Sequence, residues 1–287
     1  MMKVEPSKLL LGLIGAGIQK SRTPAMHERE AAEHGIQCIY QLIDLDELNL
    51  TVDWLPELLA SAERMGFSGL NITHPCKQRI LPFLTSLSED ARRLGAVNTV
   101  LLRNGKRIGH NTDWSGFSDN LRQRLPDARM NHLVQLGAGG AGAATAYALL
   151  KLGAKLLTIC DVSEESEEQL VEVMGFQFGE TRVQTARNLA AAMVDADGLI
   201  HATPTGLLRR PGLPLSRSLL RPELWVADIA SVTYETELLR TARELGCRTI
   251  DGTGMAIHQA VKSFELFTGI VPDMNRMELH FTSQGPD

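Results

Sequence analysis

The first third of the sequence alternates short apolar runs with longer amphipathic segments. Apolar runs of strand length occupy residues 9–14, 38–43, 67–72, 97–102 and 107–109. Segments with helical spacing lie between several of these runs and begin near Pro24, Asp53 and Glu89. Because strands and helices alternate in this way where helices cover a sheet, the pattern predicts a mixed α/β domain over residues 1–114.

The alternation becomes more regular after a linking helix, which we expect from about Ser115 to Arg124. Apolar runs follow at residues 133–136, 155–160, 182–185, 198–202, 224–230 and 248–250. Helix-length polar stretches separate these runs, and such alternation is typical of parallel strands joined by helical crossovers. Residues 115–251 are therefore predicted to form a Rossmann-type, doubly wound parallel sheet.

A further apolar stripe lies near the end of the chain, in residues 255–267. Apolar side chains recur there at helical spacing, at Met255, Ile257, Ala260, Val261, Phe264 and Phe267. A helix with one apolar face needs a surface that covers this face. We expect this helix to return to the first domain, so that residues 252–287 complete the domain begun by residues 1–114.

Composition narrows the class of protein and its partners. A chain of 287 residues exceeds the usual size of one hydrophobic core, and its 44% of hydrophobic residues can fill two. The net charge of −5 and the pI near 5.9 provide no basic surface for a nucleic acid. No apolar run approaches the roughly 20 residues that span a bilayer. We therefore expect a small-molecule substrate, and neither a nucleic-acid nor a membrane partner.

The cysteines are far apart in the sequence. They lie at Cys38, Cys76, Cys160 and Cys247. Because they form no CxxC pair, the sequence indicates neither a metal site nor a disulfide framework. The apolar run after Lys8 superficially resembles the core of a signal peptide, but Glu5 and Pro6 precede it and no small-residue cleavage pattern follows. We expect a buried strand there, reduced thiols and a cytoplasmic protein.

A glycine loop follows the predicted strand at residues 133–136. Gly137, Gly139 and Gly142 fit the spacing G-x-G-x-x-G, and a run of small residues from Ala143 opens a helix. In that context the first glycine allows a tight turn, the second lets a pyrophosphate approach the backbone, and the third permits close helix packing. Free N–H groups at the helix N-terminus also favour phosphate. The loop predicts a dinucleotide cofactor, and a plain tight turn is the alternative.

Asp161 ends the next predicted strand, about 20 residues after the glycine loop. A carboxylate there can accept hydrogen bonds from the adenosine ribose and would repel the 2′-phosphate of NADP, which favours NAD over NADP. Two alternatives stay open: Asp161 caps the following helix, or Arg182 or Arg187 approaches from another loop. A second glycine cluster, within residues 12–17, lacks the third spacing and is expected to be a loop of the first domain.

Two predicted strands of the first domain end in polar clusters. These are Asn71-Ile-Thr-His-Pro-Cys-Lys77 and His110-Asn-Thr-Asp113. Because strand ends carry the reacting groups in open α/β folds, Lys77 and Asp113 are candidates for one proton-handling pair. A lysine serves as a base only where its surroundings depress its pKa, whereas a neighbouring aspartate favours the ammonium, so the two groups would be coupled. A structural ion pair is the alternative. Three histidines are left unassigned, namely His74, His110 and His258.

Together, these motifs resemble those of the shikimate and quinate dehydrogenase family over almost the whole chain. The matching segments, in the family's order, are Ser21-Arg-Thr-Pro24, Asn71 to Lys77, Gly95-Ala-Val-Asn-Thr99, His110 to Asp113, Gly137 to Gly142, Ala202-Thr-Pro-Thr-Gly206, and Gly254-Met255 with Gln259. Several independent matches in register are far harder to obtain by chance than one. The resemblance implies a two-domain α/β oxidoreductase that uses NAD(P), with a substrate-binding first domain and a cofactor-binding second domain.

The resemblance also implies roles for individual residues. Lys77 and Asp113 would form the catalytic pair at the substrate hydroxyl that is oxidised. The implied substrate-binding residues are Ser21, Thr23, Thr73, Asn98 and Gln259. The first two would bind the substrate carboxylate and the other three would orient ring hydroxyls, for which hydroxyl and amide groups are suited. The implied cofactor-binding residues are Gly137, Ala138, Gly139, Gly140, Ala141, Gly142, Asp161, Thr203, Pro204 and Gly254.

Ordinary structural roles are the alternatives for the substrate-binding residues. Ser21 is placed to cap the helix that begins near Pro24. Asn98 could fasten a turn, and Gln259 could be an exposed helix residue.

The chain departs from the family pattern at three places. Where most members have a tyrosine and then a proline two residues on, this chain has Ser231-Val-Thr233, so an expected phenol near the substrate and nicotinamide is missing. Cys76 stands where the family often has an aromatic residue. Thr23, where biosynthetic shikimate enzymes more often have serine, and Asp161 favour the branch that handles quinate or related rings with NAD.

The sequence therefore predicts reversible NAD(P)-dependent oxidation of the C3 hydroxyl of shikimate, or of quinate or an aminoshikimate, to the 3-dehydro ketone. Two other classes of function stay open. A dinucleotide-binding regulator or sensor with weak or no catalysis would fit the departure at Ser231, and a dehydrogenase acting on a folate carrier would share the glycine loop. We expect no metal and a monomer or homodimer.

Overall fold

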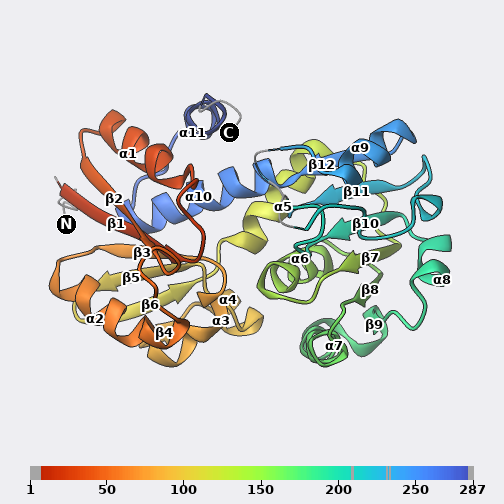
Figure 1. The fold of residues 1–287 in the computed structure, drawn as a ribbon, viewed down its shortest axis with the longest axis horizontal. Helices are drawn as coiled ribbons and strands as arrows, with labels where there is room; N and C mark the ends of the chain where they lie inside the picture. The colour runs from red at the N-terminus through yellow and green to blue at the C-terminus, as the bar shows by residue number, and fades with distance from the viewer. Residues whose placement is uncertain (1–7, 208–209, 231, 233, 284–287) are drawn as a thin grey trace. The chain divides into compact units, whose positions relative to one another are not determined.

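The computed structural model describes residues 8–207, 210–230, 232 and 234–283 (Figure 1). It divides into two compact units. Residues 8–112 and 259–283 belong to the first unit, and the described residues between 113 and 258 belong to the second. The boundary near the C-terminal end falls inside one helix, α10 (Gly252–Thr268).

The first unit contains a mixed sheet with the strand order β2-β1-β3-β5-β6-β4. Its strands are β1 (Lys8–Gly15), β2 (Gln37–Asp44), β3 (Gly69–Ile72), β4 (Ser86–Leu87), β5 (Thr99–Arg103) and β6 (Lys106–His110). β1 runs parallel to β2 and β3, and β4 runs parallel to β6, whereas β5 is antiparallel to both of its neighbours. The predicted mixed α/β domain is therefore confirmed. β4 was not predicted, because two residues give no apolar run.

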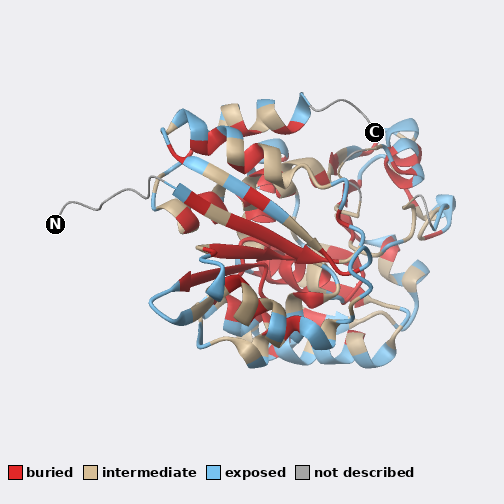
Figure 2. Ribbon diagram, turned by 60° about the vertical axis from the view of Figure 1, so that its left-hand side comes forward, coloured by how far each residue is buried: buried red, intermediate tan, exposed pale blue. Residues whose placement is uncertain are grey.

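Helices of the first unit begin where the sequence provides a start signal. They are α1 (Thr23–Glu33), α2 (Leu55–Arg64), α3 (Cys76–Arg79), α4 (Glu89–Leu94) and α11 (Met274–Thr282), with the 3₁₀ turns η1 (Val52–Trp54) and η2 (Leu81–Phe83). Pro24 lies in the first turn of α1, and the Ser88 side chain caps α4 by accepting the Ala91 N–H at 3.2 Å. Leu55 and Leu59 of α2 share a buried core with the sheet residues Leu70 and Ile72. Figure 2 shows that β1, β3 and β5 are mostly buried, whereas the edge strand β2 contains exposed residues among its buried and half-buried ones.

The second unit contains a sheet with the strand order β12-β11-β10-β7-β8-β9. Its strands are β7 (His132–Leu136), β8 (Leu156–Cys160), β9 (Val183–Thr185), β10 (Gly198–His201), β11 (Trp225–Asp228) and β12 (Arg248–Asp251). Among the described residues, each pair of neighbouring strands in it is parallel. This order is that of the doubly wound dinucleotide-binding fold, with β7 as the first strand and β10 beside it as the fourth. The predicted Rossmann-type sheet is confirmed.

Helices of the second unit lie before its first strand and between later strands. They are α5 (Asp113–Arg124), α6 (Gly140–Lys151), α7 (Glu164–Phe178), α8 (Leu189–Val194) and α9 (Glu237–Glu244), with the 3₁₀ turns η3 (Glu180–Arg182) and η4 (Arg217–Leu219). Val134 and Leu136 of β7 share a buried core with Leu199 and Val226 of the neighbouring strands. This shared core fixes the ends of β7, β8, β10 and β11, from which the following loops begin.

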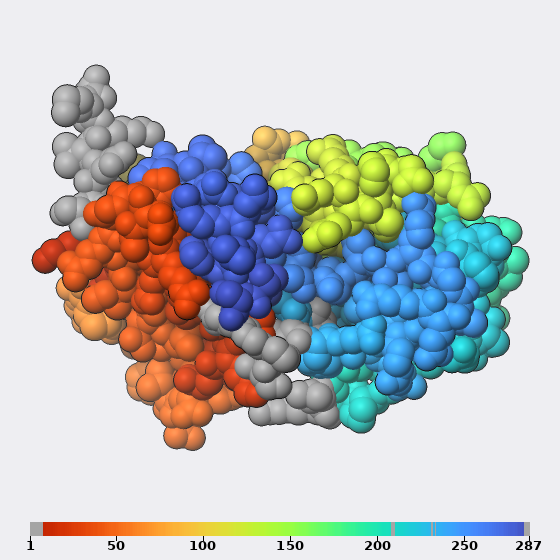
Figure 3. Space-filling view, turned by 90° about the horizontal axis from the view of Figure 1, so that it is seen from above, coloured from red at the N-terminus to blue at the C-terminus, as the bar shows by residue number. Residues whose placement is uncertain are grey.

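The part of α10 from Gln259 onward and the whole of α11 pack within the first unit. Ala260, Phe264 and Phe267 of α10 are buried, and a Cβ on Gly69 of β3 would lie 2.4 Å from the Phe267 ring. α11 lies beside α1, as Figure 3 shows for the dark blue and orange-red residues. The apolar stripe returns to the first unit from Gln259 onward, as expected, whereas its first residues, Met255 and Ile257, belong to the second unit. α11 itself was not predicted.

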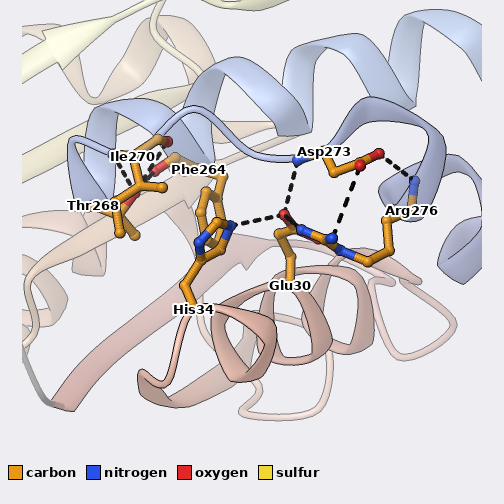
Figure 4. A network of polar contacts seen from close by, with 7 residues as sticks. All are labelled: Glu30, His34, Phe264, Thr268, Ile270, Asp273 and Arg276. Atoms are coloured by element: carbon orange, nitrogen blue, oxygen red, sulfur yellow. Dashed lines mark hydrogen bonds and ion pairs between the residues drawn. The ribbon is translucent and has the colours of Figure 1, made fainter.

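A buried carboxylate joins α11 to α1 (Figure 4). Glu30 is fully buried and accepts hydrogen bonds from Arg276 Nε at 2.8 Å, Arg276 Nη2 at 2.7 Å and the Asp273 backbone N–H at 2.9 Å. His34 Nε2 lies 3.1 Å from the same carboxylate. Burial opposes ionisation of Glu30, but these hydrogen bonds and the Arg276 charge outweigh it and lower the pKa of Glu30.

No helix in the described part of the chain has both the length and the apolar character that crossing a bilayer requires. Over the same residues, no group of three or more His, Cys, Asp and Glu side chains is placed to hold a metal ion.

Candidate active site

Lys77 lies just beyond the end of β3, in the first turn of the short helix α3. Its backbone carbonyl accepts the Val97 N–H at 2.8 Å, so its main chain is held against the segment that leads into β5. The preceding Cys76 is fully buried in the core of the unit, and burial raises the pKa of its thiol to about 11. The side chain of Lys77 is half-buried. The strand-end position predicted for Lys77 is thus the one observed, with a helical turn that the sequence pattern did not indicate.

Two of the predicted substrate residues, Asn98 and Gln259, come together in the first unit. Asn98 is 3% exposed, and its Oδ1 accepts the Thr112 backbone N–H at 2.8 Å. Its Nδ2 donates to Thr112 Oγ1 at 2.9 Å and lies 3.4 Å from Gln259 Oε1. Thr112 Oγ1 in turn donates to the Gln259 carbonyl at 3.0 Å. Gln259 is therefore not the exposed helix residue of the alternative interpretation.

A hydrogen-bond chain behind Asn98 fixes which way its amide faces. Tyr40 Oη donates to Asn71 Oδ1 at 2.7 Å, Asn71 Nδ2 donates to Thr99 Oγ1 at 3.1 Å, and Thr99 Oγ1 donates to Asn98 Oδ1 at 3.1 Å. Burial raises the pKa of Tyr40 well above its usual range, so its hydroxyl keeps its proton. This series of hydrogen bonds therefore keeps Asn98 Oδ1 directed at Thr99 and the Thr112 N–H. Sequence reasoning missed Tyr40, Thr99 and Thr112, although the last two lie inside the quoted motifs.

The loop after β1 carries Ser21 and Thr23 and is held by a residue that sequence reasoning missed. Asp44 is 2% exposed, and its carboxylate accepts the N–H groups of Gly17 at 2.8 Å and Ile18 at 2.9 Å. It also accepts from Gln19 Nε2 at 3.1 Å. Burial alone would raise the pKa of Asp44, but these hydrogen bonds outweigh it and lower the pKa. Its position could have been noticed in the sequence, because Asp44 directly follows the apolar run at residues 38–43. In the structure it is the final residue of β2 and pairs with Gly15.

Thr73 and the start of α1 border the same loop. A Cβ on Gly15 would lie 2.2 Å from Thr73 Cγ2, so the Thr73 methyl group packs on Gly15. Ser21 Oγ accepts the Thr23 N–H at 3.4 Å, while the residue at the N-cap of α1 is Arg22. Ser21 therefore lies one residue before the N-cap position, and its Oγ accepts the N–H of the first residue of α1.

Asp113 is the first residue of α5 and is 5% exposed. It directly follows Thr112, whose backbone and side chain are fixed by Asn98. Lys77 belongs to the first unit and Asp113 to the second. Their pairing stays a prediction.

The three glycines of the loop after β7 have different surroundings. Gly137 has a φ of +108°, and a Cβ there would lie 2.6 Å from the Ala202 carbonyl oxygen. A Cβ on Gly142 would lie 2.2 Å from the Gly137 carbonyl oxygen, whereas a Cβ on Gly139 would have no atom within 4 Å among the described residues. Gly139 is the N-cap of α6, which begins at Gly140. The first glycine thus forms the turn, the second leaves the backbone open, and the third allows close packing of the helix, as the fingerprint requires.

Asp161 follows β8 and supports this loop. Its Oδ2 accepts the Ala138 N–H at 2.7 Å, and its Oδ1 accepts the Ser163 N–H at 2.9 Å. The N-cap of α7 is Ser163, whose Oγ accepts the Ser166 N–H at 3.2 Å, so the interpretation of Asp161 as the helix cap is wrong. Arg182 donates to the carbonyls of Leu150 and Ala154.

The predicted cofactor residues Thr203 and Gly254 lie in the second unit. Thr203 and Pro204 follow β10, which pairs with β7. A Cβ on Gly137 would lie 3.2 Å from Thr203 Cγ2, so Thr203 lies beside the glycine loop. Gly254 packs against α5, since a Cβ there would lie 1.9 Å from Asn120 Oδ1. Its packing role is clear, and its cofactor role stays a prediction. The departures at Ser231 and Thr233 lie outside the described residues.

The strand order and the glycine loop place the chain in the class of dinucleotide-binding α/β proteins. Family models assign residues 13–100 to the shikimate dehydrogenase substrate binding domain and residues 252–278 to the shikimate 5′-dehydrogenase C-terminal domain. Residues 121–211 match the C-terminal domain of alanine dehydrogenase/PNT.

Curated and solved relatives agree with these matches. The shikimate dehydrogenase (NADP(+)) of Streptomyces avermitilis is 51% identical over 270 residues, which cover 93% of each chain. The quinate/shikimate dehydrogenase (NAD(+)) of Corynebacterium efficiens is 47% identical over 278 residues, 96% of this chain and 98% of the relative. The structure of quinate dehydrogenase from Corynebacterium glutamicum in complex with NAD has a TM-score of 0.89 and 45% identity, and the match covers 96% of this chain and 99% of that one.

The chain therefore belongs to the shikimate and quinate dehydrogenase family. It is an oxidoreductase of that family's type, which uses NAD or NADP. This confirms the resemblance read from the motifs.

Proposed function

We propose that this protein catalyses the reversible oxidation of the C3 hydroxyl of shikimate, quinate or an aminoshikimate to the 3-dehydro ketone, with NAD as hydride acceptor. The observation that carries the proposal is the cluster formed by the buried Asn98 and Thr112 with the half-buried Gln259. It brings two amides predicted to bind ring hydroxyls to one place, and the chain from Tyr40 fixes the orientation of Asn98. A rigid set of amide and hydroxyl groups suits a polyhydroxylated ring.

The reaction needs a path for one proton. When hydride leaves the C3 carbon, the hydroxyl at that carbon must also lose its proton, and a group within hydrogen-bond reach has to accept it. Lys77 takes this role in the proposal, and Asp113 shares the proton with it as a coupled pair. The nicotinamide ring, when bound, supplies the hydride acceptor. In the reverse direction the Lys77 ammonium donates the proton to the carbonyl oxygen.

The loop that Asp44 holds would bind the substrate carboxylate. Ser21 and Thr23 each have a hydroxyl that can donate, and the backbone before them is fixed by hydrogen bonds to Asp44. Thr73, which packs on Gly15 at the start of the loop, would add a hydroxyl toward the ring. The substrate would thus be oriented by its carboxylate at one end and by ring hydroxyls at the other.

The choice of NAD rests on Asp161. Relatives named for NAD and for NADP are 47% and 51% identical, so overall identity does not decide between the cofactors. A carboxylate at the end of β8 favours a ribose with free hydroxyls and disfavours an added phosphate. The C. glutamicum relative in complex with NAD agrees with this choice. We expect the protein to act as a monomer or homodimer, without a nucleic-acid partner.

The proposal is tested first by a substrate panel. Shikimate, quinate and aminoshikimate are each assayed with NAD and with NADP, with absorbance of the reduced cofactor as the readout. We expect turnover with at least one ring acid and a preference for NAD. Binding of NADH without turnover of any of the three would instead favour the regulator or sensor.

Lys77→Ala tests the proton-handling role. Because general acid–base catalysis contributes about 10²- to 10⁴-fold, kcat should fall by about that factor while the Kd for NADH stays within about twofold. Lys155→Ala, at an exposed lysine of the second unit, is the matched control. A kcat of Lys77→Ala equal to that of the control would contradict the assignment.

Asp161→Asn tests the cofactor preference. The asparagine oxygen can still accept the Ala138 N–H, so the loop keeps this hydrogen bond while the charge and the acceptor for the Ser163 N–H are lost. We expect the ratio of kcat/KM for NADP to that for NAD to rise by about tenfold or more, since like-charge contacts cost several kcal/mol. An unchanged ratio would show that the carboxylate does not select the cofactor.

A further inference from the structure

A buried histidine and aspartate end two neighbouring strands of the second unit. His201 is the last residue of β10 and Asp228 the last residue of β11, and the strand register pairs them directly. Both side chains are fully buried. His201 Nδ1 lies 2.9 Å from Asp228 Oδ1, and His201 Nε2 lies 2.6 Å from Thr203 Oγ1. A buried polar chain therefore ends at one of the predicted cofactor residues.

The hydrogen bonds of Asp228 decide which ring nitrogen of His201 carries the proton. Asp228 also accepts from Thr236 Oγ1 at 2.5 Å and from the Ala230 N–H at 3.1 Å. An ionised carboxylate can only accept, so His201 Nδ1 must be the donor in their shared bond. In the neutral ring this leaves Nε2 as an acceptor, and the Thr203 hydroxyl then points its hydrogen at His201.

The Thr203 oxygen is thereby oriented for a ligand. It accepts the Thr205 backbone N–H at 3.3 Å, which uses one of its two acceptor positions. Thr203 is half-buried, in contrast to the fully buried pair behind it. With His201 singly protonated, the Thr203 hydrogen is committed to Nε2, and Thr203 offers a ligand only an acceptor.

The place of Thr203 in the sheet indicates which part of the cofactor it faces. In this strand order, the half of the sheet with β7 and β8 carries the glycine loop and Asp161, and the half that begins with β10 binds the second mononucleotide. The loop after β10 lies against Gly137, as the 3.2 Å approach of Thr203 Cγ2 to a Cβ there shows. The matching ligand group is an N–H or O–H donor on the nicotinamide half.

We propose that His201 and Asp228 are positioning residues that hold the Thr203 hydroxyl as a hydrogen-bond acceptor for the nicotinamide half of the dinucleotide. The proposal rests on the proposed function, because it requires that the second unit binds NAD(H). His201 and Asp228 touch no ligand in it. They act by preventing Thr203 from turning its hydroxyl hydrogen toward the cofactor.

A double-mutant cycle on NADH binding tests this proposal. Thr203→Val removes the acceptor, and His201→Asn keeps a donor for Asp228 while it removes the nitrogen that faces Thr203. Because a neutral hydrogen bond is worth a factor of about 3 to 10 in affinity, each variant should weaken the Kd for NADH by about that factor. The double variant should bind like Thr203→Val alone.

The contrary outcomes are distinct. A Kd of Thr203→Val equal to that of the wild type, or losses that multiply in the double variant, would overturn the proposal. Failure of the wild type to bind NADH would overturn the proposed function as well. His201→Gln returns an acceptor near Thr203, so it should bind NADH more tightly than His201→Asn does. If His201 had only a structural role, the two variants would bind NADH equally.

Two further readouts sharpen the result. The variants should raise KM for NAD more than they lower kcat, because Thr203 binds the cofactor and not the reacting hydroxyl. An NAD analogue with an acetyl group in place of the carboxamide then separates the two donor sources. Loss of discrimination against this analogue in Thr203→Val identifies the carboxamide N–H as the donor, and retained discrimination with weakened binding identifies a ribose hydroxyl.

Discussion

The loops after β1 in the first unit and after β7 in the second are built alike. Each contains glycines, and each is followed by a helix and a parallel neighbouring strand whose end carries an aspartate. Asp44 accepts the N–H groups of Gly17 and Ile18, and Asp161 accepts the N–H of Ala138. One carboxylate on the adjacent strand thus holds the loop of each unit.

The two loops differ in the groups that they present after their glycines. In the second unit α6 begins at Gly140, so free N–H groups of the helix lie at the turn, which suits a phosphate. In the first unit the chain continues through Ser21 before α1 begins at Thr23, so hydroxyl groups replace helix amides. The Asp44 side chain is buried, whereas Asp161 is half-buried, so that part of it is exposed to solvent. In the proposed function, the same support would serve two ligands of different chemistry.

Within the comparison of the two units, the largest expected effect is at the glycine loop of the second unit. In Gly142→Ala the new Cβ would meet the Gly137 carbonyl, and backbone atoms cannot turn away as a side chain can. We expect the Kd for NADH to rise about 100-fold, equivalent to about 2.7 kcal/mol. Gly175→Ala is the matched control, since its Cβ would have no neighbour closer than 3.5 Å among the described residues. A Kd within twofold of the control would show that the close approach is not needed.

Asp44→Asn tests the loop of the first unit. An amide can accept with one atom only, so at least one of the Gly17 and Ile18 hydrogen bonds is lost. We expect the KM for the ring acid to rise about tenfold, with the Kd for NADH unchanged. The exposed Asp46 provides the control Asp46→Asn. Equal effects of Asp44→Asn on substrate and cofactor would contradict the separate roles of the two loops.

The smallest effect concerns buried histidines, which also differ between the units. His201 has partners at both nitrogens, whereas His27 of the first unit is fully buried among Tyr40, Phe264 and Phe267, and its Nδ1 has no hydrogen-bond partner among the described residues. Burial lowers the pKa of His27 to about 3.

His27 should therefore make the first unit sensitive to acid. Below its ordinary pKa of about 6.5 the unfolded chain binds a proton that the folded chain excludes, so stability falls with falling pH until about pH 3. Between pH 7.5 and 5.5 the wild type should lose about 1.4 kcal/mol of unfolding free energy that His27→Gln retains. Urea unfolding at both pH values measures this difference, with His74→Gln as an exposed control. Identical pH dependence of wild type and His27→Gln would refute it.

Most strands were predicted to within two residues, because a buried strand must be apolar over its own length. The runs at 9–14 and 133–136 became Lys8–Gly15 and His132–Leu136. β4, α3 and α11 were missed, since two of them are too short for a pattern and α11 depends on contacts such as that of Glu30 with Arg276. The turn and the helix at the glycine loop were predicted correctly because the glycine spacing is local.

The sequence by itself determined the α/β class, the strand positions, the dinucleotide fingerprint and the family, because each is written in neighbouring residues or in motifs that keep their order. Only the tertiary structure decided that Asp44 holds the loop of Ser21, that Thr112 joins Asn98 to Gln259, and that His201 connects Asp228 to Thr203. These contacts join residues brought together by strand pairing and helix packing. A hydrogen bond depends on distance and direction, which hydrophobic periodicity does not specify.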